Sequence, residues 1–134
     1  MTTRPLVSLR NLLWVDATTC AGFGAILALG SREIAGLTLI PPVLLLNTGL
    51  ALLPMAAAIA IAAWPRTVDR RAARLIVAGN VLWVVASVLV VAAGWVEPNA
   101  LGLAFIAGQA VIVAALTAFE YGASRARFAP ALSA

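Results

Sequence analysis

Four long apolar stretches occupy most of this chain and constrain its fold more than any other feature. They cover residues 9–30, 37–64, 75–96 and 100–121. A helix needs about 20 consecutive apolar residues to cross the hydrocarbon core of a bilayer. An isolated strand cannot satisfy its backbone hydrogen bonds in lipid, so each stretch is predicted to be a helix. The predicted fold class is therefore all-α: a transmembrane four-helix bundle that forms a single domain over residues 1–134.

The composition excludes an ordinary soluble domain. Hydrophobic residues make up 63% of the chain and charged residues only 10%, whereas soluble domains carry about 25% charged residues. All nine basic residues are arginine, and they cluster beside the apolar stretches. Because no aromatic side chains are interleaved with them on a basic surface, nucleic-acid binding is not expected.

The distribution of arginine predicts the orientation. Only Arg32 lies on one side of the membrane, together with Glu33 and Glu97. Loops rich in Lys and Arg remain in the cytoplasm, so both termini and the central loop are predicted to be cytoplasmic. The eight arginines on that side are Arg4, Arg10, Arg66, Arg70, Arg71, Arg74, Arg125 and Arg127.

The first stretch has an alternative interpretation. Arg4 and Arg10 precede it and Ala28-Leu29-Gly30 ends it, as in a secretory signal with a cleavage site. Its length and the acidic Asp16 inside it favour a retained span.

Asp16 is the most conspicuous polar residue of the apolar stretches, because a carboxylate at the bilayer centre costs about 2.5–3.5 kcal/mol to insert. It lies roughly 10 Å in from the cytoplasmic edge at 1.5 Å per residue. Asn80 enters the third stretch from the same side at similar depth, and Glu120 lies at the cytoplasmic end of the fourth. We therefore expect Asp16, Asn80 and Glu120 to converge in one polar layer.

Gln109 and Asn47 complete the candidate intramembrane polar site. Gln109 lies eleven positions before Glu120, which is close to three full turns, so the two share one helix face. Asn47 belongs to a stripe of mostly small residues on the second stretch, with Ala51, Pro54 and Ala58. We expect the small or polar faces of the four helices to meet at the bundle axis.

A structural role for these residues stays open. Asn, Gln, Ser and Thr often hydrogen-bond across membrane helices, at about 0.6 kcal/mol each. Asp16 has Arg10 and Arg74 as alternative ion-pair partners near the interface. Glu120 has Arg125, or the membrane interface itself, as an alternative partner.

An internal repeat is also compatible with the sequence. It would make two helical hairpins related by an axis along the membrane normal, the parallel type of repeat. Spans that each begin with Arg and end with Gly for topological reasons would give the same pattern. Arg10, Asp16, Gly30 and Glu33 recur 64 residues later as Arg74, Asn80, Gly94 and Glu97.

Several kinds of chemistry are excluded by residues that the chain lacks. There is no histidine, which rules out a haem held by two imidazoles and a His-based metal site. Cys20 is the single cysteine, so no intramolecular disulfide forms. No catalytic motif is present. We expect no enzyme activity, no cofactor and no metal.

Three short patterns give the chain a resemblance to known proteins. They are Leu9-Arg10-x5-Asp16, Asn80-x2-Trp83-x3-Ser87, and Ala100-Leu101-Gly102-x2-Phe105-x3-Gln109-Ala110 leading into Phe119-Glu120-Tyr121. Over its whole length the chain resembles small four-span bacterial integral membrane proteins of unknown function. The resemblance implies a bacterial cytoplasmic (inner) membrane location. Size and span number are also similar to those of small multidrug-resistance transporters, whose first span carries an essential Glu where this chain has Asp16, closer to the entry side.

Three functions follow as hypotheses. The first is a non-enzymatic inner-membrane accessory or lipid-associated component. The second is a small proton-coupled transporter with Asp16 as its titrating group. The third is a binder of an apolar ligand, such as a quinone or a lipid, held between Trp14, Trp83 and Phe23. Membrane lipid is the expected partner, with a second copy of the chain or another membrane protein as further partners.

Overall fold

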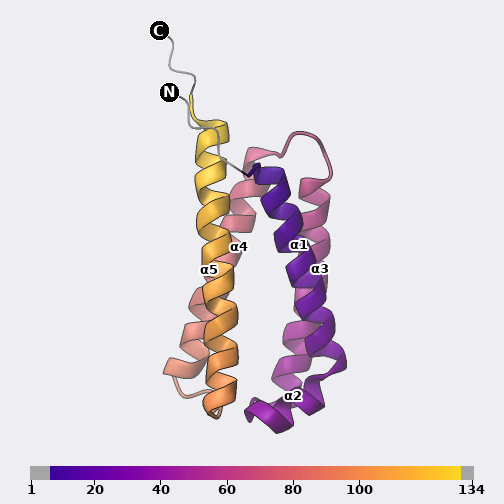
Figure 1. Ribbon diagram of the computed structural model, residues 1–134, viewed down its shortest axis with the longest axis vertical. Coiled ribbons are helices and arrows are strands. Elements are labelled where there is room, and N and C mark those ends of the chain that lie inside the picture. Colours follow the sequence, from indigo (N-terminus) through magenta and orange to yellow (C-terminus); the bar gives the residue numbers. More distant parts are fainter. Residues whose placement is uncertain (1–6, 131–134) are drawn as a thin grey trace.

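The protein is an all-α bundle, as the apolar stretches predict (Figure 1). The computed structural model describes residues 7–130, which form five helices and no strand. Four of the five, α1, α3, α4 and α5, are long and apolar enough to cross a membrane. The helices are α1 (Leu9–Leu29), α2 (Ser31–Thr38), α3 (Pro42–Ala63), α4 (Arg70–Ala92) and α5 (Ala100–Phe128).

The predicted second span, 37–64, is interrupted in the structure. The helix of this span begins only at Pro42, and a separate short helix, α2, precedes it. Between them Leu39 adopts a left-handed conformation with φ 60°, and Pro41 is extended. A residue that precedes proline avoids the helical region, whereas proline itself fits the first helical turn. The start at residue 37 was therefore wrong, because hydropathy ignores this backbone restriction.

A capping side chain sets where α4 begins. Asp69 caps α4 by accepting hydrogen bonds from the backbone N of Arg71 (3.0 Å) and Ala72 (3.1 Å). The helix therefore begins at Arg70, ahead of the predicted 75, and ends at Ala92 instead of 96. The fourth span begins at 100, as predicted, but continues past 121 to Phe128. Hydropathy locates the apolar part of a helix, while a capping side chain such as Asp69 favours its first residue.

Two helical hairpins make up the bundle. α1 packs mainly against α3, and α4 packs mainly against α5, as the two pairs in Figure 1 show. Gly24 and Gly49 lie at a close contact between α1 and α3. A Cβ added at Gly49 would lie 2.6 Å from the backbone N of Ala28 and 2.7 Å from the carbonyl O of Gly24. Glycine at these positions lets the two backbones come together.

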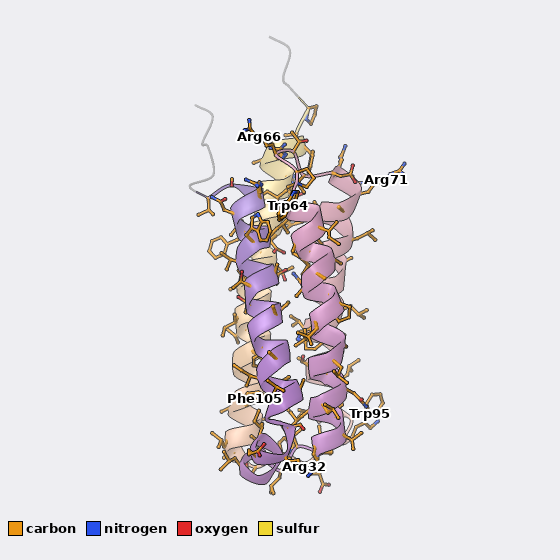
Figure 2. All side chains as sticks on the ribbon, turned by 90° about the vertical axis from the view of Figure 1, so that its right-hand side faces the viewer. Arg32, Trp64, Arg66, Arg71, Trp95 and Phe105 are labelled. Carbon is orange, nitrogen blue, oxygen red and sulfur yellow. The ribbon has the colours of Figure 1, made fainter. Side chains whose placement is uncertain are left out.

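The two ends of the bundle differ in charge. Figure 2 shows Arg66 and Arg71 at the end where α1 and α4 begin, and Arg32 at the opposite end. We call these the Arg-rich end and the α2 end. Arg4 lies outside the described residues. Seven of the eight described arginines lie at the Arg-rich end: Arg10, Arg66, Arg70, Arg71, Arg74, Arg125 and Arg127.

At the Arg-rich end, Arg10 ties α1 to α3. Its Nε donates to the carbonyl O of Ala63 (2.9 Å), and its Nη2 donates to that of Trp64 (3.3 Å). These carbonyls lie at the C-terminal end of α3, where the helix dipole favours a cation.

At the α2 end, α2 connects α1 to α3 (Figure 1) and also contacts α5 of the other hairpin. Asn99, just before α5, donates through Nδ2 to the carbonyl O of Leu37 (2.8 Å) and through its backbone N to that of Thr38 (3.1 Å). A Cβ at Gly102 would collide with the Thr38 carbonyl O. The α4–α5 turn is thus bound closely to the end of α2.

Candidate functional site

A buried polar layer lies between the two hairpins in the Arg-rich half of the bundle. Asn80 of α4 donates through Nδ2 to Oδ2 of Asp16 on α1 (2.9 Å) and to Oε2 of Glu120 on α5 (3.1 Å). The three side chains are only 3%, 1% and 0% exposed, respectively. The predicted convergence of these residues is confirmed. Positions 16 and 80, which the 64-residue offset relates, contact each other directly, while duplication itself stays a prediction.

An apolar shell keeps this layer away from water. Leu13 and Ala17 bury the neighbouring surface of α1, and Ile59 and Ala63 do so on α3. Cys20, one turn beyond Asp16, lies 3.6 Å from its Oδ1 with its thiol as donor. An ionisable group at such a depth requires polar partners, and the layer provides them from α1 and α4.

Glu120 is incompletely satisfied. Its Oε1 is buried and has no hydrogen-bond partner among the described residues. The Asn80 amide has two hydrogens, and both point to other oxygens, Asp16 Oδ2 and Glu120 Oε2. A buried acceptor without a donor is energetically costly. One additional hydrogen in the layer would satisfy Oε1 of Glu120. Two carboxyl groups this close suit a shared proton better than two negative charges.

The alternative arginine partners lie elsewhere. Arg10 bonds to the end of α3. Arg74 and Arg125 line a groove at the surface of α4 and α5, where the Arg125 Cζ lies 5.9 Å over the ring of Tyr121. The polar partners of Asp16 are Asn80 and Cys20, so its environment is not an ion pair with Arg10.

Gln109 belongs to a second polar cluster. Its Oε1 accepts from Trp83 Nε1 (2.8 Å), and its Nε2 donates to Ser87 Oγ (2.9 Å) and to the Ile106 carbonyl O (3.0 Å). Gln109 shares a face of α5 with Glu120, but eleven residues of helix separate them by roughly 16 Å. It therefore joins α4 to α5 in the α2 half and does not enter the Asp16 layer.

Asn47 joins neither cluster. It is exposed on α3, as are Ala51, Pro54 and Ala58, so the small-residue stripe does not face the bundle axis as predicted. The prediction from the small residues was wrong because Gly49, two residues after Asn47, determines which face of α3 contacts α1.

A mostly apolar cavity of about 260 Å³ adjoins the Gln109 cluster. Phe23 and Phe105 stack in its wall, with ring centroids 5.4 Å apart and an interplanar angle of 26°. Of the three aromatic residues proposed to hold a ligand, Phe23 and Trp83 line the cavity. Trp14 does not, since it packs 6.2 Å from Trp64 at the Arg-rich end. The lining is Phe23, Leu27, Ile40, Leu44, Leu45, Thr48, Trp83, Ala86, Ser87, Val90, Phe105, Ile106 and Gln109.

Phe105 is the main residue of this site that sequence reasoning missed. It lies four positions before Gln109, a spacing that places two residues on one helix face. This four-residue spacing would have predicted that Phe105 lies beside Gln109. Figure 2 shows Phe105 in the α2 half of the bundle, far from Trp64.

Comparison of the chain with protein-family models, with curated proteins and with solved structures gives no match. The evidence for function therefore comes from the two polar clusters and the cavity.

Proposed function

We propose that the chain is a non-enzymatic, lipid-associated protein of the bacterial inner membrane that binds an apolar ligand between its two hairpins. The cavity of about 260 Å³ carries this proposal. An apolar cavity of about 150 Å³ is large enough to hold benzene. This one accommodates a larger group, such as the ring of a quinone or a segment of a lipid chain.

The lining of the cavity supports an apolar ligand with one polar edge. Phe23, Phe105 and Trp83 provide aromatic surface, while Ser87 and Gln109 place polar atoms on one side. Ligand sites usually combine a predominantly apolar wall with a few fixed polar groups. The hydrogen bonds among Trp83, Ser87 and Gln109 hold that side rigid.

The orientation follows from charge. Seven described arginines lie at the Arg-rich end and Arg32 at the other, which favours a cytoplasmic location for the Arg-rich end and for both termini. An accessory role is supported by Asn47, whose amide is exposed on α3. An amide facing lipid gains a hydrogen bond when a second copy or another membrane protein packs there.

Quenching of Trp83 fluorescence tests the cavity. A parent carrying Trp14→Phe, Trp64→Phe and Trp95→Phe keeps Trp83 as its only tryptophan. In nanodiscs, a quinone with a decyl tail should quench this fluorescence saturably. Ala86→Phe should abolish the saturable quenching, because Ala86 lines the cavity. The matched control is Ala92→Phe, exposed on the same helix. Equal quenching in both variants, or none in the parent, contradicts the proposal.

A second candidate function is proton-coupled transport with Asp16 as the titrating group. The observation in its favour is the buried Oε1 of Glu120, which lacks a donor beside Asp16. In liposomes that contain a pH-sensitive dye, an imposed potential should drive proton entry through the parent and not through Asp16→Asn. Proton entry that is equal in the parent and in Asp16→Asn contradicts this candidate without affecting the cavity proposal.

A further inference from the structure

A basic groove runs between α4 and α5 on the outside of the bundle, at the Arg-rich end. Arg70 and Arg74 of α4 face Arg125 of α5 across it, and Tyr121 and Ser124 add hydroxyl groups to the lining. The groove encloses about 540 Å³. Three guanidinium groups around one hollow form a site for an anion with several oxygens, such as a phosphate.

Aromatic rings of α5 hold two of these arginines in place. The Cζ of Arg70 lies 5.9 Å from the ring centroid of Phe128, and that of Arg125 lies 5.9 Å from the ring centroid of Tyr121. A guanidinium over a ring face is attracted by the ring quadrupole. The arginines are thus positioned before any anion arrives. Asp69, the acidic residue beside them, uses its carboxylate to cap α4.

An apolar groove continues from the basic one along the same two helices. Val77 and Tyr121 line both, so the two grooves meet at these residues. Below them the lining is almost entirely aliphatic, over a volume of about 440 Å³. These residues are Val81, Val84, Val85, Ala114, Thr117 and Ala118.

We propose that this continuous groove binds one anionic phospholipid, with its phosphate at Arg70, Arg74 and Arg125 and an acyl chain along the valines of α4. The arginines lie in the first turns of α4 and the last turns of α5, which is the level of the headgroups in a bilayer. The chain path lies at the level of the hydrocarbon. A free phosphate matches only the upper part of the groove. The proposal requires the bundle to span the membrane, but it is independent of the cavity.

Native mass spectrometry of the detergent-solubilised protein tests the site. Phosphatidylglycerol should be retained as one bound molecule, and phosphatidylcholine should be retained much less. Arg74→Gln with Arg125→Gln should weaken phosphatidylglycerol binding on the order of tenfold or more. The matched control is Arg66→Gln with Arg71→Gln, which removes the same charge from exposed residues of the same end that do not line the groove.

Two further variants separate the lipid from its headgroup. Ala118→Phe should fill the apolar groove and lower lipid retention, whereas Ala115→Phe, exposed on the same helix outside the groove, should not. Arg74→Lys with Arg125→Lys should retain part of the binding, because lysine keeps the charge but loses the planar fork. All these positions are exposed, and unchanged thermal unfolding confirms that each variant is folded.

Three results overturn the proposal. Equal loss in the Arg66/Arg71 control would mean that arginines attract anionic lipid without a specific site. Release of the lipid by inorganic phosphate at equal concentration would identify a free-anion site. An unchanged lipid count in Ala118→Phe would show that no acyl chain occupies the groove.

Discussion

The two hairpins contact each other differently in the two halves of this bundle. In the Arg-rich half, Asn80 reaches Asp16 and Glu120, and α1, α4 and α5 are joined through buried hydrogen bonds. Its core cluster also extends over nine buried apolar residues, against four in the cluster of the α2 half. In the α2 half the hairpins leave a cavity of about 260 Å³ between them. One half is closed by polar groups, and the other is open between apolar and aromatic walls.

The difference shows which contacts hold the helices of a membrane bundle together and where space for a ligand remains. Lipid is as apolar as a leucine side chain, so burial of apolar surface gives little drive to join helices within it. Hydrogen bonds and close van der Waals contact must do so instead. The Arg-rich half uses the Asn80 bridge, and the α1/α3 hairpin uses the Gly24–Gly49 approach. In the α2 half, hydrogen bonds from Asn99 join the hairpins only at the end of the bundle. Between Asn99 and the Asn80 bridge, space remains for a ligand.

Among the substitutions that test this difference, replacing Asn80 should lower the stability of the bundle most. Asn80→Leu leaves both buried carboxyl groups without their shared donor, and loss of a donor to a buried acceptor costs about 1–3 kcal/mol. We expect the free energy of unfolding to fall by about 3 kcal/mol, measured by detergent-induced unfolding followed by circular dichroism. The two hairpins should then move apart in the Arg-rich half, as they do around the cavity in the α2 half.

Asn47→Leu is the matched control for this substitution. The side chain of Asn47 is exposed on α3, so the same chemical change should leave the bundle stability within about 0.5 kcal/mol of the parent. If the two substitutions lowered stability equally, the Asn80 bridge would not be what closes the Arg-rich half.

The close approach of α1 and α3 should give the next largest effect. A Cβ at Gly49 would lie 2.6 Å from the Ala28 backbone N, so Gly49→Ala must push the two helices apart. Overpacking of this kind costs about 1–3 kcal/mol, and the altered hairpin should also reshape the cavity and weaken quinone quenching of Trp83. Gly22→Ala is the control, because nothing lies within 4 Å of a Cβ there. A neutral Gly49→Ala would mean that this contact does not fix the cavity wall.

Sequence reasoning predicted the strongest physical constraints. Lipid demands long apolar helices, so their number and order followed from hydropathy. A carboxylate in lipid demands partners, so the convergence of Asp16, Asn80 and Glu120 followed from depth and sidedness. Each of these inferences rests on a large energetic cost that leaves few alternatives.

The remaining features depend on contacts that no sequence pattern specifies. Helix α2 is short and partly polar, and its position depends on Asn99, which lies more than sixty residues away in the sequence. The exposure of Asn47 depends on which face of α3 Gly49 presents to α1. The cavity forms because α1, α3, α4 and α5 do not fill the space between them, and incomplete packing leaves no signature in hydropathy or periodicity.

Glu120→Gln should have the smallest effect on stability and the most informative one on chemistry. Glutamine keeps the shape of the side chain and supplies two hydrogens, one of which can reach Asp16 while its oxygen still accepts from Asn80. We expect the free energy of unfolding to change by less than about 1 kcal/mol, because no buried group loses its partner. Infrared spectroscopy should then detect the carbonyl band of a protonated carboxylic acid in the parent at neutral pH and lose it in Glu120→Gln. Glu97→Gln, exposed at the α2 end, should keep the band. A parent without this band would mean that the closed half carries two negative charges and that the hydrogen missing at Glu120 Oε1 is supplied by something other than a shared proton.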